Sequence, residues 1–393
     1  MPTNDLVSPL AALPPLRIRG RYVHPIVQGG MGVGVSAHRL AGTVALHGAV
    51  GTLSSVDLRR HHADLMAATG RCLDKPTIDA ANLTALDREI VAARKLAAGN
   101  GLIAVNVMRA VSEYAPYVRR SCESGADAVV VGAGLPLDLP DLTANHPEVA
   151  LIPILSDVRG VAVVLKKWMR KRRLPDAIVI EHPRYAGGHL GAASIGDLTD
   201  PRFDFEGVLE GVAVLYRELG IEREQIPVIL AGGINSHDKV RRLIGLGAGA
   251  VQIGTPFAVT QECDAHPNFK KVLAEARPED IVTFVSVAGL PARAVRTPWL
   301  DTYLRREARA QSHASKRTRC IMAFDCLLTC GLRDGIAKIG QFCIDNHLAA
   351  ALRGDVKKGL FFRGAESLPF GNAIRSVGEL LQYLLTGQVP ALA

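Results

Sequence analysis

Aromatic residues are scarce in this sequence, at 5% of 393 residues, and no apolar run reaches the roughly 18 residues needed to cross a bilayer. The first 20 residues carry an aspartate and several proline breaks instead of a basic start and an apolar centre, so we do not interpret them as an export signal. Seven cysteines are too few and too unevenly spaced for a disulfide framework, which favours a reducing cytoplasm. The 38 glycines follow no Gly-X-Y period, which excludes collagen.

The charge balance is moderately basic, with 46 Lys and Arg against 38 Asp and Glu and a net charge of +8. The densest basic run, at residues 166–173, is interpreted as the solvated end of a helix, with a patch for an acidic partner as the alternative. No zinc-finger spacing or alternation of aromatic and basic residues accompanies it. We therefore expect a small-molecule substrate and no nucleic-acid or membrane partner, and a homodimer is left open.

Short apolar runs alternate with longer amphipathic stretches along most of the chain. Eight such runs occur, at residues 24–28, 49–52, 102–107, 128–131, 151–155, 177–180, 227–230 and 250–253. The runs lack polar alternation, as parallel strands covered by helices do. The count of eight predicts an α/β protein of the (β/α)8 TIM barrel class.

Two regions depart from this repeat. Residues 56–101 are polar and rich in helical pattern, and we interpret them as an insertion around the third strand. The long tail after residue 253 ends in an amphipathic segment at 376–385 that we expect to close the ring of helices. The barrel would then comprise residues 1–258 and 372–393, and residues 259–371 would form a mostly helical cap, or substrate domain, inserted after strand eight.

Glycines follow the seventh and eighth strands, where barrels commonly bind phosphate. Gly232 and Gly233 lie between a strand and a helix, and Gly254 and Thr255 follow the next strand. Close approach of a phosphate to the backbone is easiest at glycine, and the amides at a helix start are donors for it. The alternative is that these glycines only form tight turns.

A second glycine-rich turn, at Gln28, Gly29, Gly30 and Met31, follows the first strand. It lacks the register of a dinucleotide-binding fingerprint and has no acidic ribose partner at the right distance. These residues suit a shelf beneath a flat isoalloxazine ring, with ordinary packing as the alternative for Met31.

Seven segments carry a resemblance to a known family: residues 25–31, 104–107, 132–136, 181–191, 231–234, 252–255 and 289–297. In this order they resemble the FMN-dependent barrel family of nitronate monooxygenases, formerly 2-nitropropane dioxygenases, and flavin-dependent enoyl-acyl-carrier-protein reductases. The resemblance covers most of residues 20–300. It departs from the family pattern at Pro256 and at the segment 182–185, which is not the usual acidic pattern, and this puts the substrate in doubt.

The resemblance implies roles for individual residues. Gln28, Gly29, Gly30 and Met31 would line the flavin ring, which Asn106 and Ser156 would face from strand ends. The ribityl phosphate would be held by Gly188, Gly232, Gly233, Gly254 and Thr255.

His189 occupies the family's active-site histidine position. An imidazole with a pKa near neutrality can remove a substrate proton or donate one. The alternatives are that His189 only binds the phosphate or a loop carbonyl, or that His182 serves instead, although His182 follows its strand more closely and suits a structural role.

Four cysteines, Cys320, Cys326, Cys330 and Cys343, fall within a short stretch. Cys326 and Cys330 have the spacing of two thiols on one helix face, and four thiolates can hold zinc or an iron–sulfur cluster. Apolar surroundings and the absence of a C-x-x-C pair favour buried packing as the alternative.

The function predicted first is an FMN-dependent oxidoreductase that oxidises a carbon acid such as an alkyl nitronate, with oxygen as acceptor. The alternative enzyme takes hydride from NAD(P)H and passes it to an enoyl thioester or a quinone. A third interpretation is a non-catalytic barrel that binds a phosphate ligand, because fold does not fix function.

Overall fold

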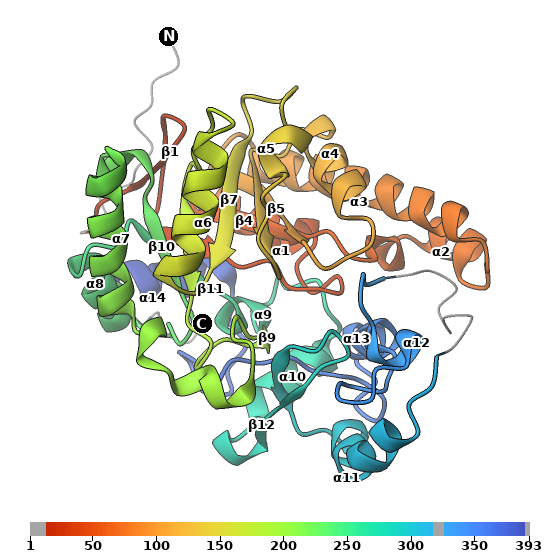
Figure 1. The fold of residues 1–393 in the computed structure, drawn as a ribbon. Helices are drawn as coiled ribbons and strands as arrows, with labels where there is room; N and C mark the ends of the chain where they lie inside the picture. Colours follow the sequence, from red (N-terminus) through yellow and green to blue (C-terminus); the bar gives the residue numbers. More distant parts are fainter. Residues whose placement is uncertain (1–12, 317–325, 390–393) are drawn as a thin grey trace.

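The computed structural model describes residues 13–316 and 326–389 and contains a closed barrel of eight parallel strands (Figure 1). In barrel order the strands are β3 (Ile26–Gln28), β4 (Val50–Ser54), β5 (Leu102–Met108), β6 (Ala128–Gly132), β7 (Ala150–Leu155), β8 (Ile178–Glu181), β10 (Val228–Ala231) and β11 (Ala250–Ile253). Parallel pairing of β11 with β3 closes the barrel. The predicted TIM barrel is therefore confirmed, because each apolar run forms a buried strand.

Helices surround the barrel, and their polar outer faces explain the amphipathic stretches. They are α1 (His38–Leu46), α3 (Lys75–Ala97), α4 (Tyr114–Glu123), α5 (Leu139–Leu142), α6 (Val158–Met169), α7 (Phe205–Leu219) and α8 (His237–Gly245). The helix α14 (Val377–Thr386) contacts both α8 and α1 and so occupies the place where the ring closes. None of the helices in the described residues has the length and hydropathy of a membrane span.

The stretch 56–101 is the connection between β4 and β5. It contains η1 (Leu58–His61), α2 (Ala63–Thr69) and the 23-residue α3, which packs against α1 and α4 as a regular ring helix. The interpretation of the whole stretch as an insertion is therefore wrong, since only η1 and α2 are additional. The polar composition of α3 concealed its buried face.

From residue 255 onward the chain forms further helices and most of a small antiparallel sheet at the carboxyl ends of the barrel strands (Figure 1). The elements are α9 (Thr255–Ala258), α10 (Pro267–Glu275), η5 (Pro278–Asp280), β12 (Ile281–Val285), β13 (Pro291–Val295), α11 (Pro298–Ser312), α12 (Gly331–Asp334) and α13 (Ile344–Leu352). Strand β13 pairs with β12 and also with β9 (Gly188–His189), which lies in the connection after β8. The cap sheet therefore holds the histidine loop, a pairing that the helical prediction for this region missed.

The shorter elements lie outside the repeat. A hairpin of β1 (Leu16–Ile18) and β2 (Arg21–Val23) precedes the barrel, and three 3-10 turns lie between barrel elements: η2 (Ile195–Thr199), η3 (Pro201–Phe203) and η4 (Arg223–Gln225).

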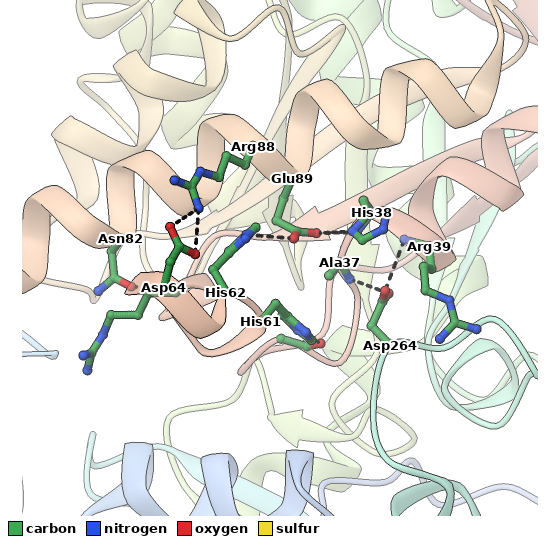
Figure 2. A network of polar contacts seen from close by, with 12 residues as sticks. Ala37, His38, Arg39, His61, His62, Asp64, Asn82, Arg88, Glu89 and Asp264 are labelled. Atoms are coloured by element: carbon green, nitrogen blue, oxygen red, sulfur yellow. Dashed lines mark hydrogen bonds and ion pairs between the residues drawn. The ribbon is translucent and has the colours of Figure 1, made fainter. Parts of the chain in front are cut away.

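Two carboxylates from distant segments fix the start of α1, directly after the loop that leaves β3 (Figure 2). Asp264 Oδ2 accepts hydrogen bonds from the Ala37 and Leu40 N–H groups at 2.8 and 3.1 Å, and its Oδ1 accepts one from Arg39 N–H at 3.1 Å. Glu89 of α3 accepts a hydrogen bond from the backbone N–H of His38 at 2.8 Å. These bonds satisfy donors that a helix start leaves free, and they anchor the loop of residues 29–36.

We expect Asp264→Ala to lower the free energy of unfolding by about 2 kcal/mol, because three backbone donors lose their acceptor. Urea denaturation followed by circular dichroism measures the change. Asp264→Asn retains one carbonyl oxygen at the helix start and should lose less. An unchanged midpoint and slope for the alanine variant would contradict this role for Asp264.

Candidate active site

Two adjoining cavities open at the carboxyl ends of the barrel strands, the position of active sites in this fold. The larger, here called the wide cavity, has a volume of about 610 Å³, and the smaller, here called the cup, about 160 Å³. Gly30, Met31, Glu181, Gly187 and Phe362 line both. One extended ligand could therefore occupy the cup with one end and the wide cavity with the other.

The cup is lined by the turns that follow β10 and β11, including Gly232, Gly233, Gly254 and Thr255. Gly233 has a φ of +74°, and a Cβ there would lie 2.9 Å from Tyr185 Cβ, so the turn requires glycine. Within the described chain, no hydrogen bond uses the backbone N–H of Gly233 or of Thr255. Free backbone donors in a glycine-lined hollow fit an anionic group such as a phosphate.

A segment of the C-terminal region, residues 362–368, lies along the cup and is called the strap here. Gly364 N–H donates to Thr255 Oγ1 at 2.9 Å, and Asn235 Nδ2 donates to the Ser367 carbonyl at 2.8 Å. Lys239 Nζ donates both to the Gly233 carbonyl at 2.8 Å and to Glu366 Oε2 at 2.7 Å. Sequence reasoning missed the strap because its partners lie 109 and 132 positions away in the chain.

The predicted flavin shelf lies between the two cavities. Gly29, Gly30 and Met31 line the cup, and Gly30 also lies so close to Asn106 that a Cβ would overlap it. Gln28, in contrast, is fully buried in the barrel, where its amide accepts from Thr52 N–H at 2.9 Å and donates to the Thr52 carbonyl at 3.1 Å. Gln28 lines neither cavity and joins β3 to β4 below the shelf.

Polar side chains gather in the wide cavity where the barrel strands end. Asn106, Ser156 and His189, with the backbone of Gly188, line it together. His189 Nε2 is buried with no hydrogen-bond partner in the described chain, and burial lowers the pKa of its imidazole to about 4. The expectation of a pKa near neutrality is therefore wrong, because the desolvated ring disfavours a charge. His189 is therefore neutral at pH 7, so one of its ring nitrogens carries no proton.

Glu181, at the end of β8, lines both cavities, and burial raises the pKa of its carboxyl to about 7. Sequence reasoning missed it as a site residue. Its position at the end of a barrel strand, eight residues before His189, was the available signal.

His182 lies away from both cavities. Its Nδ1 accepts from Arg184 N–H at 3.2 Å, and its ring packs 4.8 Å from that of Tyr185 and 5.3 Å from that of Phe205. The Nε2 atom lies 3.4 Å from Asp204 Oδ1. These contacts agree with a structural role for His182.

The cysteines do not have the expected helical arrangement. Cys326 lines the wide cavity, Cys330 is the buried N-cap of α12, and Cys343 is the buried N-cap of α13. Cys326 and Cys330 precede α12, so the prediction that both lie on one helix is wrong. In residues 13–316 and 326–389 no three His, Cys, Asp or Glu side chains form a group that could hold a metal. Cys320 lies outside the described residues, so zinc or iron–sulfur binding stays a prediction.

Taken together, fold and site define a TIM-barrel protein with two adjoining cavities, one with free backbone N–H donors and the other with a buried, unpartnered imidazole. A family model of nitronate monooxygenases matches residues 19–387, and the chain belongs to that family of oxidoreductases. Family membership also supports a flavin cofactor.

Individual relatives match shorter stretches. A probable nitronate monooxygenase of Bacillus subtilis is 37% identical over 76 residues, 19% of this chain and 22% of the relative. The nitronate monooxygenase of Pseudomonas aeruginosa is 32% identical over 118 residues, 30% of this chain and 31% of the relative. The chain spans about a fifth to a half of the length of the curated relatives it matches.

Solved structures share the fold over most of the chain. FabK from Thermotoga maritima has a TM-score of 0.61 at 23% identity, covering 92% of this chain and 91% of its own. Nitroalkane oxidase from Streptomyces ansochromogenes also has a TM-score of 0.61, at 20% identity, covering 92% of this chain and 95% of its own. Both likenesses support the same barrel architecture.

Proposed function

We propose that this protein is an FMN-dependent oxidoreductase that oxidises a carbon acid such as a nitroalkane, or its anion, an alkyl nitronate, with oxygen as electron acceptor. The observation that carries the proposal is the adjoining pair of cavities, one with free backbone donors and the other with an unpartnered, neutral imidazole. FMN, when bound, supplies the two-electron redox chemistry that no side chain has.

Residues of the chain would bind the phosphate, accept the substrate proton and stabilise the developing charge. The Gly233 and Thr255 N–H groups would hold the phosphate. His189 Nε2 would accept the proton that a neutral nitroalkane loses from its carbon. Asn106 and Ser156 carry donors that suit the negative charge developing on the nitro oxygens.

The second candidate is reduction of an enoyl thioester or a quinone with NAD(P)H as the reductant. The size of the wide cavity and the many aliphatic side chains around it favour this candidate, because a short nitroalkane would leave much of it empty. A non-catalytic phosphate-binding barrel is disfavoured by membership of an oxidoreductase family.

Anaerobic stopped-flow measurements separate these functions. Purified protein should be yellow and release FMN on denaturation, and a nitronate should bleach the flavin faster than NADH or NADPH does. Faster bleaching by a nicotinamide would favour the second candidate. Colourless protein that does not take up added FMN would overturn both.

Glu181 gives the proposed reaction a pH dependence that can be predicted in sign. Its carboxyl is protonated below about pH 7 and charged above it, while His189 stays neutral over that range. Because a carboxylate repels an anionic substrate, we expect kcat/KM for a preformed nitronate to fall roughly tenfold as the pH rises from 6 to 8.5. The isosteric variant Glu181→Gln should lose this fall. Its persistence in the variant would assign the titration to another group.

A further inference from the structure

Much of the lining of the wide cavity is apolar. Aliphatic side chains from the barrel and from the C-terminal region line it: Val56, Val111, Leu327, Ile344 and Leu348. Three acidic residues also line the wide cavity, Asp157, Glu181 and Asp345. Asp157 has a structural partner, since its side chain accepts from Gly160 N–H at 2.8 Å as the cap of α6. Glu181 lines both cavities together with Gly30 and Met31 of the shelf. The third acid, Asp345, has no role in the proposed reaction.

Asp345 lies in the first turn of α13 and is 2% exposed. Its Oδ2 accepts a hydrogen bond from Arg60 Nη2 at 2.8 Å. Its Oδ1 is buried and has no hydrogen-bond partner among the described residues. One oxygen of this carboxylate, Oδ2, is therefore hydrogen-bonded within the protein, and the other, Oδ1, is not.

The hydrogen-bonded oxygen, Oδ2 of Asp345, belongs to a structural ion-pair cluster. Arg60 also contacts Asp57, whose Oδ1 lies 2.7 Å from Arg59 Nε, so two acids and two arginines form one buried ionic cluster. This cluster joins α13 to the turn η1 of the barrel. It uses only Oδ2 of Asp345, so a purely structural role leaves Oδ1 unexplained.

A buried carboxylate oxygen without a donor is costly, and in native proteins a ligand, an ion or an ordered water usually completes its contacts. Burial and the negative charge of Asp57 raise the pKa of Asp345 to about 7, despite the opposing effect of Arg60 and Arg59. Burial is the main cause of this shift, so a further positive charge beside Oδ1 would favour the ionised carboxylate. A ligand that brings a hydrogen-bond donor, and above all an ammonium group, would supply what is missing.

We propose that Asp345 is a specificity-determining residue whose Oδ1 accepts a hydrogen bond from an ammonium group at the far end of the substrate. The substrate class is then a carbon acid whose reacting carbon lies at the shelf and whose aliphatic chain carries an amine along the apolar wall. The position of the reacting carbon at the shelf rests on the proposed function. The binding of an ammonium group by Asp345 does not depend on it.

The test compares preformed nitronates of ω-amino nitroalkanes with unsubstituted nitronates of the same length, over a series of chain lengths. In the wild-type protein kcat/KM should favour the amine by at least roughly tenfold at the best length. Asp345→Asn should abolish that preference, because its carbonyl can turn to Arg60 and its amide N–H group then faces the ammonium. A wild-type protein with no preference at any length would overturn the inference without any variant.

Glu181→Gln is the matched control, since it removes the other candidate carboxylate of the cavity. The preference for the amine should survive in Glu181→Gln. If it is lost in Glu181→Gln and kept in Asp345→Asn, the ammonium site belongs to Glu181. If Asp345 has only a structural role, its substitution should lower stability and should lower kcat/KM for all substrates alike. An unchanged ratio of kcat/KM between amino and unsubstituted nitronates would therefore also overturn the inference.

Calorimetric binding of hexylammonium and of hexanol to the holoprotein separates this inference from the proposed function. Preferential binding of hexylammonium that is lost in Asp345→Asn would support the ammonium site even if no nitronate were oxidised. Equal binding of both probes, together with normal nitronate oxidation, would overturn the inference and leave the proposed function intact.

Discussion

Gly233→Asp is expected to yield a folded protein that no longer retains FMN. The turn carries a free backbone N–H and has no space for a side chain near Tyr185. Aspartate introduces both bulk and a negative charge where a phosphate would bind, so affinity for FMN should fall by roughly 100-fold or more. The measurement is the ratio of FMN released on denaturation to polypeptide.

Two control variants separate charge from strain. Gly233→Asn has the same shape as the aspartate variant and tolerates a positive φ equally well, so it should retain clearly more FMN. Gly207→Asp adds the same charge on α7, where a side chain meets open space, and should retain FMN fully. Equal FMN content in the Asp and Asn variants would argue against a phosphate at this turn.

The barrel and the cup glycines could be predicted because their signals are local. Each strand is a short apolar run, and Gly232 and Gly233 are identifiable as a turn between a strand and a helix without knowledge of any distant residue. The strap and the pairing of β13 with β9 have no such signal, because each depends on contacts between segments over 100 residues apart. Short strands such as Gly188–His189 also carry too few residues to show a period.

The electrostatics of the site were equally inaccessible from the sequence. Glu181, His189 and Asp345 have shifted pKa values because burial removes water from each, and burial is a property of the assembled cavity. The same reason explains the error on His189, for which the ordinary pKa of histidine was assumed. Residue type and spacing were enough to identify His189 as a candidate, but its charge state depends on its burial in the folded protein.

His189→Asn should leave FMN bound and slow flavin reduction by a neutral nitroalkane by roughly 100- to 10,000-fold, the effect typical of losing a general base. The imidazole is neutral at pH 7, its Nε2 has no partner in the described chain, and it lines the wide cavity. Asparagine keeps the position polar but cannot accept the proton. Single-turnover flavin reduction under anaerobic conditions measures the loss.

The matched substrate for this variant is the preformed nitronate, which has already lost its carbon proton. A general base is not needed for it, so the loss with nitronate should be much smaller than with the neutral nitroalkane. His182→Asn is the matched protein control, because His182 lies outside both cavities and should change either rate only a few-fold. Equal losses on the two substrates would instead indicate that His189 orients the substrate or stabilises charge on the nitro oxygens. An unchanged rate on both would remove His189 from the mechanism and leave Glu181 as the proton-handling group to test.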